Sequence, residues 1–163
     1  NAIVPTLELP SHHGPDVQTV LPHIEIFTTS MTVPTTVMHM HSVTIDLTEE
    51  VPLYGVIELF DDTERVRIVK NAEGIRSTAE IIEYAKDLGH SRGDMVDICI
   101  WEETIGVSTV RGLFQQRVIN KSKLFYLQAI HQESNVIPEN IDAIRAAMGI
   151  KNSTAYNDHG FYS

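Results

Sequence analysis

Two pairs of histidines are the residues of this sequence best suited to chemistry near neutral pH. His39 and His41 are one residue apart in an alternating stretch, and in a strand such side chains point to the same face. His12 and His13 stand at the start of a short helical pattern, where free backbone N–H groups attract anions. Another histidine opens the segment His131-Gln132-Glu133-Ser134. Imidazole both transfers protons and ligates metals, so these residues indicate a candidate site.

Three interpretations of these histidines stay open on the residues alone. A His-x-His strand with a further His and Glu could bind Zn or Fe(II). Alternatively, His39 or His41 is a base acting on a phosphorylated or anionic substrate, and the helix start at His12 and His13 is the anion site. In the third interpretation the histidines only satisfy local hydrogen bonds in a binding or structural domain. The sequence contains no Gly-rich dinucleotide fingerprint and no P-loop.

Composition limits the partners. Twelve basic and 22 acidic residues give a net charge of −10, which argues against a nucleic-acid surface. No apolar run approaches the roughly 20 residues of a membrane helix, so we expect neither nucleic acid nor membrane as a partner. The start Asn1-Ala2-Ile3 has no initiator Met and no signal-type segment. We therefore expect a portion of a longer protein.

The lone cysteine, Cys99, lies in the apolar run Val96–Trp101. No Lys, Arg or His stands close to it in the sequence to activate a thiolate, so we expect a buried apolar side chain. A single cysteine cannot form an internal disulfide, which fits a reducing compartment.

Hydrophobic periodicity predicts about six strands and four helices. Alternation favours strands over 23–33 and 39–48, joined closely enough to form an antiparallel pair. We expect Ser11 to cap the first helix and Ser77 with Glu80 to form a capping box. The fold class is α+β, a largely antiparallel sheet with helices packed on one face. Residues 1–150 form the domain, 151–163 form a tail, and the long polar segment 112–123 is an extended hairpin tip. The other expected strands are 65–70, 97–102, 104–113 and 123–132, and the expected helices are 15–21, 52–62, 78–88 and 138–148.

Several motifs together resemble the C-terminal, catalytic half of the archaeal-type (type II) glyceraldehyde-3-phosphate dehydrogenases. The likeness runs from Asn1 to about Met148. It is carried by Leu9–Val17, Val33–His41, Ser77–Gly89, Gln128–Ser134 and Val136–Arg145.

This resemblance implies a catalytic-domain portion of a phosphorylating dehydrogenase. Such an enzyme oxidises glyceraldehyde 3-phosphate to 1,3-bisphosphoglycerate with NAD or NADP and inorganic phosphate, in glycolysis or gluconeogenesis. It is implied to be a cytoplasmic homotetramer whose cofactor is bound mainly by an N-terminal dinucleotide-binding domain that this chain lacks. The alternative is a metal- or ligand-binding domain that reuses the fold without dehydrogenase activity.

The resemblance also implies roles for individual residues. His39 is the catalytic base, His12 and His13 contact the substrate, Gln132 contacts the cofactor, and no metal is bound; His41 is a supporting neighbour. The family's nucleophilic cysteine, in a Ser-Cys-Asn-Thr-Thr motif, has no counterpart, and Cys99 stands in another context. The segment 112–123 is longer than the usual hairpin. We therefore expect this chain alone to be inactive.

Overall fold

The computed structural model describes residues 2–35, 38–114 and 117–150, with side chains outside 109–121. The chain divides into two compact units, Asn1–Thr36 and Val37–Ser163. No helix among the described residues is long and apolar enough to cross a membrane.

The N-terminal unit contains one helix and a two-stranded ribbon. Helix α1 spans His13–Val20, and β1 (Val4–Pro5) pairs antiparallel with β2 (Met31–Thr32). The predicted strand over 23–33 is wrong except at β2. The facing segment contains Pro5 and Pro10, which have no N–H to donate to a ladder. The remaining contacts are isolated hydrogen bonds, such as Thr6 N to Ser30 O at 2.9 Å.

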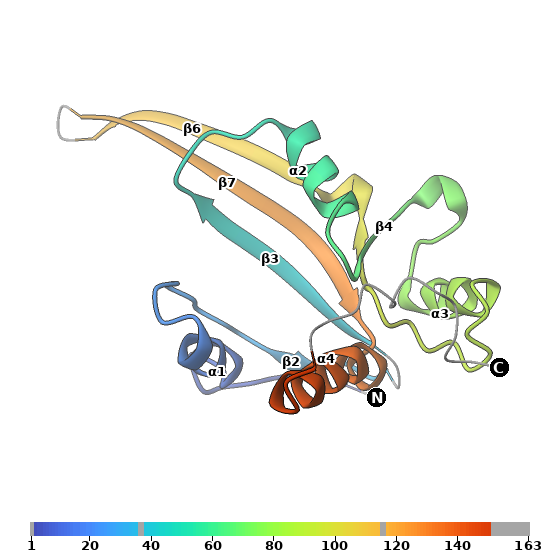
Figure 1. Ribbon diagram of the computed structural model, residues 1–163. Helices are drawn as coiled ribbons and strands as arrows, with labels where there is room; N and C mark the ends of the chain where they lie inside the picture. Colours follow the sequence, from blue (N-terminus) through green and yellow to red (C-terminus); the bar gives the residue numbers. More distant parts are fainter. Residues whose placement is uncertain (1, 36–37, 115–116, 151–163) are drawn as a thin grey trace. The chain divides into compact units, whose positions relative to one another are not determined.

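The larger unit is built on a five-stranded sheet (Figure 1). The strand order is β3-β7-β5-β4, with β6 also paired to β7. Every pair is antiparallel except β4 with β5. The strands are β3 (His39–Leu47), β4 (Val66–Val69), β5 (Ile98–Trp101), β6 (Gly106–Phe114) and β7 (Arg117–Ile130).

Strand β7 lies at the centre of this sheet. One edge pairs with β3 from His39↔Ile130 to Leu47↔Ser122. The other edge is shared by β5 and β6. The predicted pairing of 23–33 with 39–48 is therefore wrong, because alternation identifies a strand's faces but does not identify its partner. The extended hairpin predicted over 112–123 is confirmed by the pair Phe114↔Arg117; the tip, 115–116, lies outside the described residues.

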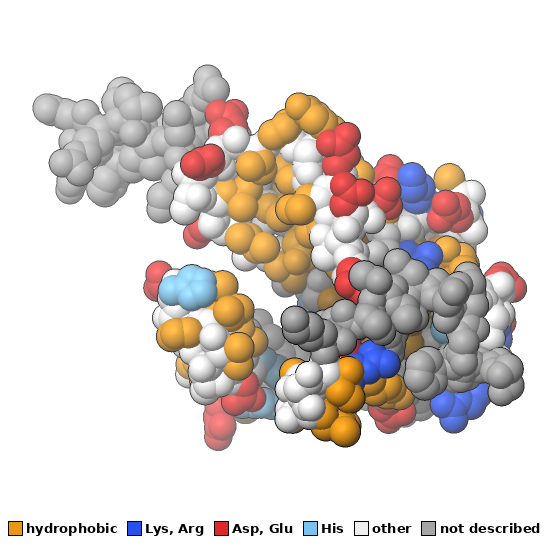
Figure 2. All heavy atoms as spheres, in the orientation of Figure 1, with side chains coloured by type: hydrophobic (Ala, Val, Ile, Leu, Met, Phe, Trp, Pro, Cys, Tyr) orange, Lys and Arg blue, Asp and Glu red, His pale blue; other side chains and the backbone are white. Residues whose placement is uncertain are grey.

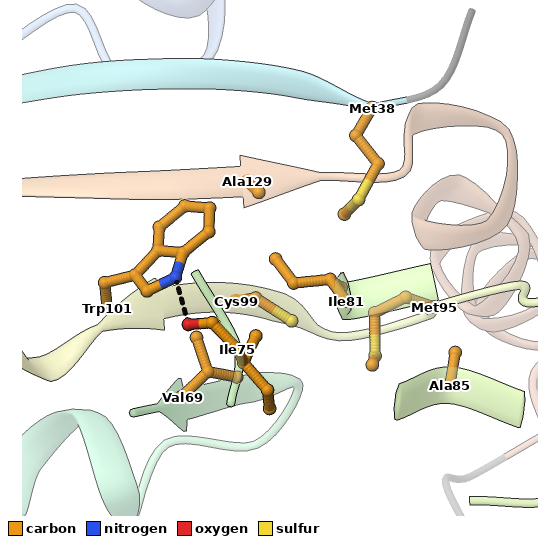
Figure 3. Close-up of a cluster of buried hydrophobic side chains, with 9 residues drawn as sticks. All are labelled: Met38, Val69, Ile75, Ile81, Ala85, Met95, Cys99, Trp101 and Ala129. Atoms are coloured by element: carbon orange, nitrogen blue, oxygen red, sulfur yellow. Dashed lines mark hydrogen bonds between the residues drawn. The ribbon is translucent and has the colours of Figure 1, made fainter. Parts of the chain in front are cut away.

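Helices cover both faces of the sheet. Successive strand residues point to opposite faces, and β5 sends Cys99 to a cluster with α3 (Thr78–Asp87) and Ile100 to a cluster with α2 (Leu53–Asp61). The α+β class and the largely antiparallel sheet are confirmed. The expectation that helices pack on one face is corrected to α2 on one face and α3 on the other. The α3 cluster, drawn in Figure 3, comprises Met38, Val69, Ile75, Ile81, Ala85, Met95, Cys99, Trp101 and Ala129.

Local sequence signals predict the start of α3 correctly and the start of α4 incorrectly. The capping box of α3 is confirmed: Ser77 Oγ accepts from Glu80 N, and Glu80 Oε2 accepts from Arg76 N and Ser77 Oγ. Helix α4 spans Gln132–Ala147, so it begins earlier than predicted and carries the buried Pro138 inside it. Pro138 is compatible with that position at the loss of one backbone hydrogen bond. Single 3₁₀ turns lie at Asn71–Glu73 and Glu102–Thr104. The predicted tail, 151–163, lies outside the described residues.

Candidate active site

The paired histidines lie at the start of β3. His39 is opposite Ile130 of β7 and His41 is opposite Gln128. Since β3 is regular through both residues, their side chains share one face of the sheet, as the sequence predicted. Both imidazoles are exposed, so a small molecule can reach them.

The register gives His41 a partner that sequence reasoning missed. The side-chain amide of Gln128 donates from Nε2 to Nδ1 of His41 at 3.1 Å. An imidazole whose Nδ1 accepts carries its proton on Nε2. Gln128 thus orients His41 and sets its tautomer, in keeping with a supporting role for that ring.

The backbone that leads into His39 has an unusual conformation. Met38 has φ +66°, in the left-handed region that a long side chain rarely adopts. Its side chain is only 7% exposed and points into the α3 cluster, toward Ala129 and Ile81 (Figure 3). Burial of Met38 offsets the backbone strain and positions the residue that follows it.

The same register brings His39 near Gln132. Ile130, the partner of His39, is followed after one residue by Gln132, the first residue of α4. The Gln132 side chain is exposed. His39 and Gln132, far apart in the sequence, therefore both lie at the same end of the β3–β7 pair.

His12 and His13 lie at the start of α1 in the N-terminal unit. Their ring centroids are 4.0 Å apart, and both side chains are exposed. The N-cap residue is His12, so the prediction that Ser11 caps this helix is wrong. Instead Ser11 Oγ donates to Thr28 Oγ1 at 2.9 Å.

Thr28 holds this helix start from outside the helix. Its Oγ1 accepts from Gly14 N at 3.0 Å and donates to Ser11 O at 2.9 Å. Ser11 N in turn donates to Thr28 O at 2.8 Å. One hydroxyl thus uses its donor and both acceptor positions, and no local sequence pattern indicates this pairing. A β-carbon at Gly14 would lie 2.9 Å from Thr28 Oγ1, which explains the glycine.

Cys99 is unsuited to nucleophilic attack, as predicted. It is fully buried, and burial, reinforced by the charge of Asp97, raises the pKa of its thiol to about 12. A thiol that remains protonated at neutral pH is a poor nucleophile.

The metal interpretation finds no support in the part of the chain that the structure describes. No group of three or more His, Cys, Asp or Glu side chains there is placed to hold a metal ion.

Comparison with known proteins decides the family. Residues 1–105 match the family described as "Glyceraldehyde 3-phosphate dehydrogenase, C-terminal domain". The chain belongs to this glyceraldehyde-3-phosphate dehydrogenase family. A protein of Methanococcoides burtonii named glyceraldehyde-3-phosphate dehydrogenase is 49% identical over 156 residues, which cover 95% of this chain and 42% of that protein.

Two further dehydrogenases agree with this assignment. The protein of the same name from Methanopyrus kandleri is 48% identical over 147 residues, 90% of this chain and 39% of its own length. The one from Thermococcus onnurineus is 47% identical over 146 residues, 90% of this chain and 40% of its own length. The chain thus spans about two fifths of these dehydrogenases and represents their catalytic-domain part rather than an unrelated binding domain.

Proposed function

We propose that this chain supplies the substrate-binding and acid–base part of a phosphorylating glyceraldehyde-3-phosphate dehydrogenase. The enzyme would oxidise glyceraldehyde 3-phosphate to 1,3-bisphosphoglycerate, using NAD or NADP and inorganic phosphate. The thiol that attacks the aldehyde would come from a part of the enzyme outside these 163 residues. The family membership and the buried state of Cys99 both support this division.

His39 is the proposed catalytic base. Its imidazole would remove the proton of the hemithioacetal hydroxyl, which forms when the thiolate attacks the aldehyde. The nicotinamide, when bound, would supply the hydride acceptor. An exposed imidazole on a rigid strand, with Met38 buried before it, suits that task.

Two other groups bind rather than react. His12 and His13, with adjacent exposed rings at a helix start, are the proposed contacts to the anionic substrate. Gln132 is the proposed contact to the cofactor, because a side-chain amide complements the donor and acceptor of a carboxamide.

The observation that carries the proposal is the register of β3 on β7. Because His39 is opposite Ile130, the proposed base stands beside the strand end from which Gln132 begins α4. A base and a cofactor contact have to be close, because the proton leaves the hydroxyl group of the same carbon that loses the hydride.

The complete enzyme with His39→Ala tests the proposal. A general base contributes about 10²–10⁴-fold to turnover, so kcat should fall by that factor while KM for glyceraldehyde 3-phosphate changes little. His23→Ala, at another exposed histidine, is the control and should leave kcat unchanged. Near-normal turnover of His39→Ala would remove His39 from the mechanism.

We further propose that the complete enzyme is a cytoplasmic homotetramer in which this sheet forms much of the subunit contact. Met40 and Phe125 are 54% and 44% exposed on the sheet. Figure 2 shows hydrophobic side chains gathered over α2 and the strands beside it. On α2 itself, Leu53, Tyr54 and Leu59 are exposed. Exposed apolar area of this kind is typical of an interaction surface. Light scattering on the complete protein would report the assembly.

A further inference from the structure

Strands β6 and β7 continue beyond the rest of the sheet as a two-stranded ribbon. Strand β3 pairs with β7 no farther than Ser122, and of the described strands only β6 is paired with β7 beyond that point. Five residue pairs, from Val110↔Lys121 to Phe114↔Arg117, make up this ribbon, which is therefore about 17 Å long. Figure 1 shows it projecting from the sheet. We call residues 110–114 and 117–121 the arm.

The arm differs in charge from the rest of the chain. Between Glu103 and Glu133 the sequence contains four basic residues and no acidic one. The other eight basic residues share the remainder of the chain with all 22 acidic residues. Of the four, Lys123 forms an ion pair with Asp46 of β3. The other three belong to the arm itself: Arg111, Arg117 and Lys121.

Apolar residues accompany the cations of the arm. Leu113 is paired with Val118, and Val110, Phe114 and Ile119 lie at neighbouring positions. A two-stranded ribbon is only marginally stable in water unless a further surface packs against it. A surface that is both apolar and negatively charged would therefore suit the arm.

The outer surface of α2 has the apolar part of this character. The helix turns Val56, Ile57 and Phe60 toward the sheet. Tyr54 and Leu59 are 69% and 63% exposed, so the arm of the same chain does not cover them. Figure 2 shows acidic side chains next to the hydrophobic ones in this region.

The end of α2 supplies the negative charge. The last turn of the helix contains no basic residue, although the negative end of a helix dipole favours cations. The first basic residues along the chain are bound elsewhere, Arg65 to Asp142 and Lys70 to Glu102. In the part of the chain that the structure describes, no ion pair includes the four exposed carboxylates at this helix end, which are Glu58, Asp61, Asp62 and Glu64.

We propose that the arm binds the outer surface of α2 in a second copy of this chain. The arm contributes cations and apolar residues, and the surface contributes carboxylates and apolar side chains. Opposite charges would set the orientation of the contact, and the apolar residues would supply its buried area. A second copy is favoured over a nucleic acid because a protein of net charge −10 repels a polyanion. This inference rests on the proposed homotetramer and names one of its contacts.

Charge reversal in the complete enzyme tests the arm. The double substitution Arg117→Glu, Lys121→Glu turns two attractions into repulsions, so the dissociation constant of the assembly should rise roughly 10–100-fold. Light scattering over a range of dilutions measures this constant. The double substitution Arg76→Glu, Lys86→Glu makes the same change in net charge at and near α3 and is the control. It should leave the dissociation constant unchanged.

A charge swap identifies the surface that the arm binds. The double substitution Asp61→Lys, Asp62→Lys should weaken the assembly as much as the reversal in the arm does. When all four substitutions are combined in one chain, the contact is attractive again, and the dissociation constant should return to within a few-fold of its original value. Such recovery excludes misfolding as the cause of the weaker assembly.

Three results would overturn the proposal. An unchanged dissociation constant in the arm variant would show that the arm is not a subunit contact. Weaker assembly without recovery in the charge swap would place the arm on another surface. A raised KM for NAD or NADP with intact assembly would assign the arm to the dinucleotide-binding part of the enzyme.

The assembly readout needs no activity, so it separates this inference from the proposed function. An inactive enzyme that passes the charge-swap test would contradict the dehydrogenase reaction and support the arm. A monomeric complete protein would overturn both the homotetramer and the arm. An active tetramer that the arm variant leaves intact would overturn the arm alone.

Discussion

Cys99 and Ala129 lie opposite each other across β5 and β7, and both are fully buried. The only thiol of the chain thus faces a small side chain in the interior of the sheet. Its surroundings are those of a packing residue in the buried cluster beneath α3.

We predict that Cys99 reacts very slowly with thiol reagents in the folded protein. Burial raises the pKa of its thiol to about 12, so the thiolate fraction at pH 8 is minute. Alkylation followed by mass spectrometry should show modification of Cys99 only after denaturant is added. Fast labelling in the native state would contradict the buried position.

The protein purified as residues 1–163 should not oxidise glyceraldehyde 3-phosphate with NAD or NADP. The proposed base and binding groups are present, but Cys99 cannot serve as the nucleophile. Reduced-cofactor absorbance is the measurement, with the complete enzyme as the positive control. Robust activity of the 163-residue protein would show that the nucleophile has been misplaced.

Thr28→Val should weaken the N-terminal unit at the start of α1. The substitution removes the hydroxyl that serves Ser11 and Gly14. Unsatisfied polar groups of this kind cost about 1–3 kcal/mol. In the complete enzyme, we expect a lower melting temperature and a raised KM for glyceraldehyde 3-phosphate, because His12 and His13 lie on the loosened turn. Thr29→Val, at the exposed neighbouring threonine, should show neither effect.

The capping box of α3 should make a pH-dependent contribution to stability. Loss of the cap in Ser77→Ala should cost about 1 kcal/mol. The hydrogen bond from the Arg76 amide, with smaller effects from Ser77, lowers the pKa of the Glu80 carboxyl below its ordinary value of 4.5. The ionised carboxylate therefore stabilises the fold above that ordinary value, and this stabilisation is lost as the pH falls through the lowered pKa.

Denaturant unfolding of the Glu80→Gln protein measures this contribution. At pH 7 the free energy of unfolding of Glu80→Gln should be lower than that of the unsubstituted protein. In strong acid this difference should shrink. A deficit that stayed constant with pH would argue against the hydrogen-bonded carboxylate as its source.

Gly93→Ala should destabilise the protein more than Gly89→Ala. Both glycines have positive φ, +74° and +98°, so both substitutions carry backbone strain. At Gly93 a β-carbon would also lie 2.4 Å from Ile82 Cγ2 and 3.1 Å from its carbonyl oxygen, whereas nothing lies within 4 Å at Gly89. Overpacking costs about 1–3 kcal/mol, and the difference in unfolding free energy between the two variants measures it. Equal losses would mean that Ile82 moves aside freely.

The sequence predicts local structure correctly wherever short-range interactions decide that structure. The Ser77–Glu80 spacing located the start of α3, alternation located β3 through His39 and His41, and the apolar surroundings of Cys99 indicated a buried thiol. Each of these depends on residues within a few positions of one another. Residue types and motif order also sufficed to indicate the family.

Only the tertiary structure decided which segments meet. Alternation does not encode a strand's partner, so the sequence pattern paired β3 with 23–33 when its partner is β7. That register places His39 at the strand end next to α4 and joins Gln128 to His41. The pairing of β5 with β7 sets Cys99 opposite Ala129. The hydrogen bond between Ser11 and Thr28 likewise joins residues 17 positions apart, and no periodic pattern in the sequence predicts it. The physical reason is the same in each case. Long-range hydrogen bonds and burial select partners through the free energy of the folded unit, whereas helix propensity and capping act within one or two turns.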